Sequence, residues 1–252
     1  MTNLAKILSL GIAALFVMAS LSVLADPVYL GMSPGRSFTS DLVGNFDGPP
    51  PVRWVFFNGN EETGTMGTPT IADLDGDGIK EVLVTTRDGY LHVLESDGTL
   101  RWSFTQGTEW WFASPAVGDL TGDGKMEIVI GGYYQNRGDP LVYALNAEDG
   151  SILWTFDTYR GTYIAGIEAN PVLVDFNGDG YLDVLLASDN YFFYVLDGPT
   201  GEVIFADRFN HFIRSSIPLA DTDLDGNLES VSYTHLRAHE TVLDLVCRLL
   251  LE

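Results

Sequence analysis

The sequence predicts an all-β protein, a β-propeller of four-stranded blades in an incomplete ring of about three full blades and the start of a fourth. Three observations support this fold class. An acidic loop of nearly constant composition begins at residues 73, 119, 175 and 221. Short runs rich in β-branched and aromatic residues, bounded by glycine-containing turns, fill the intervals between these loops. Beyond the N-terminal leader, no segment shows the apolar period of an amphipathic helix.

Each interval contains the same set of short strands. The expected strands are 69–72, 81–86, 90–94 and 99–104 in the first repeat, 115–118, 127–130, 141–145 and 151–156 in the second, and 171–174, 183–186, 192–196 and 202–205 in the third. Four strands in about 40 to 50 residues are typical of a propeller blade. A stack of sandwiches is the alternative, but the fixed order of loops and strands favours blades. Residues 52–56 resemble the last strand of a blade, and such a strand can complete the final blade of a closed ring.

The four acidic loops are candidate metal sites. Oxygen-bearing side chains recur at loop positions 1, 3, 5 and 9, and glycine stands at position 6, which suits a short loop that wraps a Ca²⁺ ion. Asp, Asn and Gly also favour turns that hold no ion, which is the alternative interpretation of a single loop. The repetition favours Ca²⁺ in a structural role, over Mg²⁺ with its stricter geometry. The candidate ligands are Asp73, Asp75, Asp77 and Glu81 in loop 1; Asp119, Thr121, Asp123 and Glu127 in loop 2; Asp175, Asn177, Asp179 and Asp183 in loop 3; and Asp221, Asp223, Asp225 and Glu229 in loop 4.

The remaining segments have a different character from the repeats. Residues 1–25 are typical of a signal peptide, with Lys6 before an apolar run and Val23-Leu24-Ala25 as the cleavage site; a membrane anchor is the alternative. Residues 26–51 form an N-terminal extension to the partial propeller, 52–230. We therefore expect a secreted, periplasmic or cell-surface protein, without membrane insertion after the signal is cleaved.

Residues 231–252 abandon the repeat and resemble the translation of a sequencing adapter, so we expect a non-native tail. The tail contains the pair His235 and His239, four residues apart as in some zinc sites, but the His-Glu-x-x-His order of zinc proteases is absent. The single cysteine, Cys247, also lies there, so disulfides are not expected to stabilise the domain.

The net charge of −22 argues against nucleic acid and anionic membrane surfaces as partners. Fourteen of the 35 acidic residues belong to the four loops, where bound cations would neutralise them.

The acidic loop followed by an apolar strand resembles the FG-GAP/VCBS repeats, over about residues 69–230. This resemblance implies a calcium-binding propeller, like that of integrin α-chain heads, with the loop joining the first two strands of each blade. Thr121 departs from the acidic residue usual at position 3 and is expected to weaken loop 2. The segment 144–154 also resembles quinoprotein (PQQ-like) propeller repeats, which implies that Trp154, and in matching places Trp102 and Phe205, dock between blades.

The segments before each leading strand are rich in aromatic residues: 109–112, 159–163 and 209–214. We expect them to gather on one face, where they could bind a protein or carbohydrate ligand, and about half of them to pack between blades instead. His211, Arg214 and Glu109 show no nucleophile–base spacing, and mid-strand His92 is expected to be packed. The sequence therefore predicts a binding or adhesion module more than an enzyme. The alternative is the propeller part of an exported enzyme, either a quinone-dependent dehydrogenase or a polysaccharide lyase.

Overall fold

The computed structural model describes residues 52–57, 64–65, 67–106, 113–133, 142–158, 166–209, 213–214, 217–220, 229–231 and 246–247. The predicted signal peptide, the N-terminal extension, the aromatic segments 109–112 and 159–163, and residues 221–228 of loop 4 lie outside this part of the chain.

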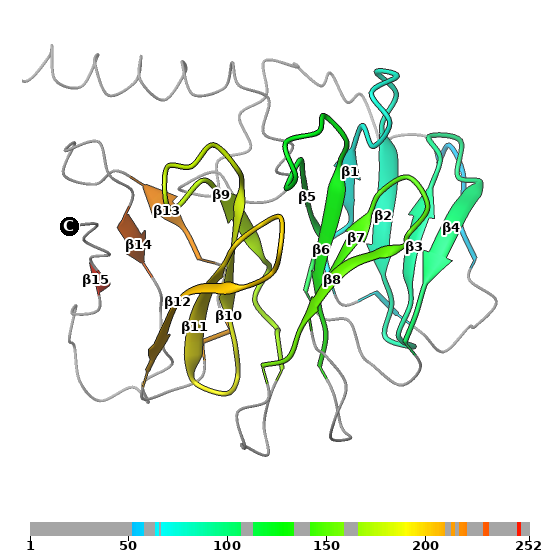
Figure 1. Cartoon of the computed structure of the whole chain (residues 1–252). Helices are drawn as coiled ribbons and strands as arrows, with labels where there is room; N and C mark the ends of the chain where they lie inside the picture. The colour runs from blue at the N-terminus through cyan, green and yellow to red at the C-terminus, as the bar shows by residue number, and fades with distance from the viewer. Residues whose placement is uncertain are drawn as a thin grey trace, which may run out of the picture.

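Three four-stranded antiparallel sheets follow one another along the chain, each with its strands in sequence order (Figure 1). They consist of β1 (Thr70–Ala72), β2 (Glu81–Thr85), β3 (Leu91–Leu94) and β4 (Leu100–Phe104); β5 (Ala116–Gly118), β6 (Glu127–Gly131), β7 (Val142–Asn146) and β8 (Ile152–Phe156); and β9 (Val172–Val174), β10 (Asp183–Ala187), β11 (Phe192–Leu196) and β12 (Val203–Arg208). The prediction of three full four-stranded blades is therefore confirmed.

A fourth sheet of three strands comprises β13 (Leu219–Ala220), β14 (Glu229–Val231) and β15 (Val246–Cys247), which makes it the start of a fourth blade. Its third strand belongs to the tail that we expected to be non-native and pairs with β14 through two residue pairs.

The prediction of a strand at 52–56 is wrong, because no strand is assigned there among the described residues. The segment nevertheless lies against the first blade, where the indole N–H of Trp54 donates to the carbonyl oxygen of Ser96 at 3.0 Å. Aromatic contacts, from Trp54 to the β3–β4 hairpin and from Phe56 to His92, thus hold this segment in place of a backbone ladder.

The hydrophobic core lies between neighbouring blades. One cluster joins Leu83 and Val93 of the first blade to Ile128 and Tyr143 of the second, and an equivalent cluster joins the second blade to the third. The two middle strands of the third blade are the most buried and the last strand is the least: every residue of β10 is buried, whereas most of β12 is exposed. Each blade therefore depends on its neighbours for the burial of its apolar side chains.

The outermost strand of each blade carries the same β-bulge. In the first blade Val93 pairs with Trp102 and Leu94 pairs with Leu100, so that Arg101 is the extra residue. The corresponding extra residues are Leu153 in β8 and Ile204 in β12. A bulge at one fixed place turns one side chain per blade in a new direction.

Candidate metal-binding loops

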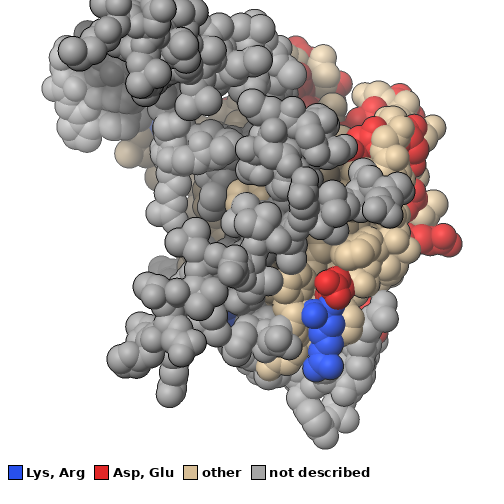
Figure 2. All heavy atoms as spheres, turned by 90° about the vertical axis from the view of Figure 1, so that its left-hand side faces the viewer, with Lys and Arg blue, Asp and Glu red and all other residues tan. Residues whose placement is uncertain are grey.

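The acidic loops join the first two strands of the three complete blades, as the family resemblance implies, and all lie at the upper end of the molecule in Figure 1. Figure 2, which looks at the left-hand side of Figure 1, shows acidic side chains gathered toward the upper edge of its described surface. The antiparallel order places the hairpins β3–β4, β7–β8 and β11–β12 at this same end.

The carboxylate at position 1 organises each loop from within. In loop 1, Asp73 accepts the backbone N–H groups of Gly76 at 2.7 Å and Gly78 at 2.8 Å. Both glycines have positive φ, 78° and 83°, a backbone conformation that residues with a Cβ rarely adopt. The acids Asp119 and Asp175 accept the equivalent pairs of N–H groups in loops 2 and 3. The residue pattern that the three loops share is therefore explained by a common backbone conformation.

The carboxylate at position 9 is buried in all three described loops. Glu81, Glu127 and Asp183 are 1%, 2% and 0% exposed. Each accepts the N–H of its loop's second residue, for example Leu74 to Glu81 at 2.8 Å. Burial raises the pKa of all three carboxyl groups above the ordinary value, with the hydrogen bonds opposing this shift. An ionised carboxylate in these positions needs a compensating positive charge.

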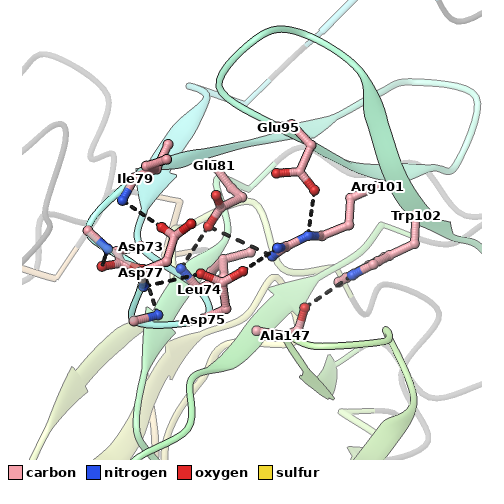
Figure 3. Close-up of polar contacts among 12 residues, drawn as sticks. Asp73, Leu74, Asp75, Asp77, Ile79, Glu81, Glu95, Arg101, Trp102 and Ala147 are labelled. Atoms are coloured by element: carbon pink, nitrogen blue, oxygen red, sulfur yellow. Dashed lines mark hydrogen bonds and ion pairs between the residues drawn. The ribbon is translucent and has the colours of Figure 1, made fainter.

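Loop 1 brings three of its four predicted ligands together. Carboxylate oxygens of Asp73, Asp75 and Glu81 lie within 4.8 Å of one another (Figure 3). Asp77 is not part of this cluster, and its carboxylate accepts the N–H of Ile79 at 2.6 Å. Oxygen ligands alone, with carboxylates predominant, suit a hard cation such as Ca²⁺.

Loops 2 and 3 each have three acids, with Thr121 and Asn177 at position 3. Within the described residues these loops show no cluster of three acidic groups, because position 3 carries no carboxylate. Each instead has a buried oxygen without a hydrogen-bond partner in that part of the chain, namely Thr121 Oγ1 and Asp183 Oδ1. A buried carboxylate oxygen without a donor is suited to a cation, so the residues of loop 3 fit a Ca²⁺ ion.

One basic residue enters loop 1 that sequence reasoning missed. Arg101 of β4 forms ion pairs with Asp75 and with Glu95 of the β3–β4 hairpin, the second at 2.7 Å, and its Nη1 lies 3.8 Å from Glu81 Oε2 (Figure 3). The hydrogen bond from Arg101 lowers the pKa of Asp75. Asp75 and Arg101 are 26 residues apart, so only the register of β4 brings them together.

A second charged cluster lies at the opposite end of the blades, where β10 turns into β11. Arg214 donates to both carboxylate oxygens of the fully buried Asp189, at 2.9 and 2.7 Å, and lies 3.3 Å from Glu168. Of the three residues Glu109, His211 and Arg214 that the sequence suggested as a group, the structure describes only Arg214. The acids Asp189 and Glu168 were missed because an acid in a turn usually faces water.

The other aromatic and histidine expectations are resolved in part. In segment 209–214, Ile213 is fully buried and Phe209 packs against the core of the third blade, which agrees with the expected packing role. His92 is 6% exposed, and its Nδ1 lies 2.8 Å from Ser103 Oγ while its ring stacks on that of Tyr90. No helix among the described residues is long and apolar enough to cross a membrane.

The comparisons with known proteins agree with this architecture. A model of the FG-GAP-like repeat matches residues 73–130. Lambda-carrageenase of Pseudoalteromonas carrageenovora is 30% identical over 142 residues, which cover 54% of this chain and 14% of the relative. The biofilm matrix protein Bap1 of V. cholerae superimposes with a TM-score of 0.51 and 22% identity, over 71% of this chain and 30% of Bap1.

The C-terminal domain of PilY1 from Pseudomonas aeruginosa superimposes with a TM-score of 0.50 and 18% identity, over 68% of this chain and 44% of that domain. These two likenesses show the fold. The chain spans less than half the length of each of the three proteins. The chain therefore has blades of the β-propeller type in an incomplete ring, and its residues 73–130 are similar to the FG-GAP-like repeat.

Proposed function

We propose that this chain is part of an exported, calcium-stabilised β-propeller that serves as a binding or adhesion module for a protein or glycan. The observation that carries the calcium part is the buried carboxylate of Asp183. Its Oδ2 accepts two backbone N–H groups, from Phe176 and Asn177, whereas its buried Oδ1 has no hydrogen-bond partner among the described residues.

A cation beside this oxygen would offset the cost of burying the charge. Without one, burial makes ionisation of this carboxyl group less favourable and raises the pKa of Asp183 above its ordinary value, although backbone hydrogen bonds oppose the shift. With Ca²⁺ bound by loop 3, the ion would join β9 to β10, because its ligands come from the connection between these strands. The free energy of Ca²⁺ binding would then add to the free energy of unfolding.

The blade order supports a separate surface for a ligand. The strands β4 and β8 end at the edge opposite the acidic loops, and the aromatic segments 109–112 and 159–163 follow them in the sequence. Aromatic side chains bind sugars and protein partners through their large apolar faces. In this proposal the acidic loops stabilise the fold, and the opposite edge recognises the ligand.

The second candidate, the propeller part of an exported enzyme, is favoured by one comparison. The relative at 30% identity is named for action on carrageenan, which favours a carbohydrate-active protein over a quinone-dependent dehydrogenase. A glycan array that includes carrageenans, probed with the chain, tests glycan binding. An assay of reducing ends released from the bound glycan then separates the module from the enzyme.

Thermal melting with and without chelator tests the calcium proposal. We expect chelation to lower the melting temperature and added Ca²⁺ to restore it, with uptake visible by calorimetry. The variant Asp179→Ala should weaken the site of loop 3 and leave the others unchanged. An unchanged melt in chelator, together with no heat of Ca²⁺ binding, would refute the proposal.

A further inference from the structure

Arg101 distinguishes the first blade from the other two. It is the extra residue of the β4 bulge, and the equivalent residues, Leu153 and Ile204, are apolar. Leu153 packs against the core between the second and third blades, whereas Ile204 is 38% exposed. The same β-bulge therefore carries a guanidinium in the first blade and a hydrocarbon side chain in the second and third blades.

The guanidinium of Arg101 lies among carboxylates that are also predicted metal ligands. It pairs with Asp75 at position 3 and lies near Glu81 at position 9 of loop 1, while Glu95 holds it from the hairpin side (Figure 3). The Arg101 side chain is 22% exposed and that of Glu81 only 2%, so solvent screens this arrangement incompletely. A positive charge thus partly compensates the buried carboxylate of Glu81, although burial still raises its pKa.

We propose that Arg101 is the resident counter-cation of loop 1, so that a divalent cation binds there only when the guanidinium gives up Asp75 and Glu81. This inference rests on the proposed calcium binding of the other loops. A divalent ion among the same oxygens would repel the guanidinium, so the two cations compete. Loop 1 is therefore a weaker Ca²⁺ site than loop 3, and its blade is stabilised without metal.

Loop 3 provides the internal contrast. Its position-9 carboxylate, Asp183, has a buried Oδ1 without a hydrogen-bond partner in the described residues. In loop 1, by contrast, Arg101 lies 3.8 Å from Oε2 of the position-9 carboxylate, Glu81. The bulge residue of that blade, Ile204, has no charge to offer. In loop 3, a bound cation is thus needed to offset the negative charge of the position-9 carboxylate. In loop 1, Arg101 of the same blade supplies this positive charge.

Titration calorimetry with Ca²⁺ and melting in chelator test this inference on the whole chain. The test variant is Arg101→Leu, which copies the second blade. We expect one site to bind Ca²⁺ about tenfold more tightly. The melting temperature in chelator should fall, and the rise on adding Ca²⁺ should be larger than in the wild type. Adding Asp73→Asn, which disables loop 1, should abolish the gain in affinity.

Two further variants serve as a control and as the reciprocal test. Arg208→Leu makes the same change in net charge on an exposed residue at the far end of β12, and should leave Ca²⁺ binding unchanged. Ile204→Arg introduces a guanidinium at the bulge position of the third blade that corresponds to Arg101. Because Ile204 is 38% exposed, this variant should fold normally, and it should weaken one Ca²⁺ site.

The outcomes separate this inference from the calcium proposal. If the wild type takes up no Ca²⁺ at all, both fail. If the wild type binds Ca²⁺ but Arg101→Leu and Ile204→Arg leave every affinity unchanged, the calcium proposal stands and the role of Arg101 is wrong. If Arg208→Leu tightens binding as much as Arg101→Leu does, the effect is one of net charge, and the specific competition is likewise refuted.

Discussion

Trp154 of the second blade donates its indole N–H to the carbonyl oxygen of Gly198 in the third blade, at 2.6 Å. The contact recurs one blade earlier, from Trp102 to Ala147 at 3.1 Å, and again from Trp54 to Ser96. Each indole ring also lies on a glycine of positive φ in the neighbouring hairpin; these glycines are Gly201, Gly150 and Gly98. The same tryptophan–hairpin joint thus links the third blade to the second, the second blade to the first, and the first blade to the segment 52–57.

Replacing Trp154 with Phe should destabilise the protein by about 2 kcal/mol, because the buried carbonyl of Gly198 loses its donor and part of the ring contact disappears. Denaturant unfolding followed by circular dichroism measures this change. Trp102→Phe is the matched control, with an indole that is only partly buried, and should cost about 1 kcal/mol. Equal unfolding midpoints for Trp154→Phe and the wild type would contradict the importance of this joint.

Gly201→Ala tests the other half of the joint. Gly201 has a φ of 72°, and a Cβ there would lie 2.6 Å from Trp154 Cδ2, so backbone strain and a clash add together. We expect a loss of about 3 kcal/mol in the free energy of unfolding. Gly178→Ala has a similar φ of 76° but open space around the Cβ, and should cost only the strain, about 1 kcal/mol. If both variants unfold at the same denaturant concentration, the indole does not require the glycine.

Removing Arg214 and removing Asp189 should destabilise the protein by different amounts. Asp189 is fully buried, whereas the Arg214 side chain is 49% exposed. Arg214→Met leaves a buried carboxylate without this partner and should cost about 3 kcal/mol. Asp189→Asn leaves a guanidinium that water can solvate and should cost about 1 kcal/mol. Chemical denaturation of both variants and the double variant gives the coupling, and the reverse order of costs would refute the burial argument.

His92 should make the protein less stable at mildly acidic pH. Burial lowers the pKa of His92 below its ordinary 6.5, although Asp88 opposes the shift. The unfolded chain therefore binds the proton more readily, and the stability due to neutral His92, complete above pH 6.5, is lost as pH falls through that value toward the folded-state pKa.

His92→Phe should remove this dependence while it keeps an aromatic ring between Tyr90 and Phe56; Ser103 is exposed, so water can replace its lost partner. The measurement is the free energy of unfolding of both proteins at pH 7.5 and 5.5. Glu127 and Asp183, whose pKa values are raised by burial, act with the opposite sign, so the difference between the two proteins is the quantity to compare. Identical pH slopes would contradict the prediction.

Thr121→Asp should strengthen loop 2 as a Ca²⁺ site. It adds a carboxylate at position 3, where the hydroxyl oxygen of Thr121 is buried without a hydrogen-bond partner in the described part of the chain. We expect one Ca²⁺ dissociation constant to fall about tenfold, and the melting temperature in chelator to fall as well. Thr121→Val removes the oxygen, keeps the shape and should weaken the same site. Calorimetry that finds no difference between these two variants would show that position 3 is not a ligand.

The strands could be predicted from the sequence because each blade pairs strands that follow one another along the chain. Runs such as 81–85 and 192–196 are apolar, β-branched or aromatic, and the turns between them contain glycine, so the observed bounds differ from the expected ones by a few residues at most. The docking of Trp102 and Trp154 also followed from the repeat. Residues 52–56 read as a strand for the same local reason, but no neighbouring strand pairs with them among the described residues.

The charged partners could not be predicted, because they depend on register and burial. Nothing in the neighbourhood of Arg101 in the sequence indicates that a bulge turns it toward Asp75, 26 residues earlier. Asp189 follows a strand and resembles a turn residue, yet it is fully buried beneath Arg214. The repeat spacing predicted the acid at position 9 of each loop as a ligand. It did not predict that this acid is buried, because burial depends on how the blades pack together.

The tryptophan–hairpin joints make the molecule a row of units coupled to nearest neighbours. In such a row, cooperativity is limited by the weakest joint, and a unit that packs against one neighbour unfolds more readily than a unit that packs against two. The second blade shares a core cluster with each flanking blade, so it is held from both sides. Its strands β6 and β7 should therefore be the last amides to exchange with solvent, and a single broken joint should divide the row into two segments that melt separately.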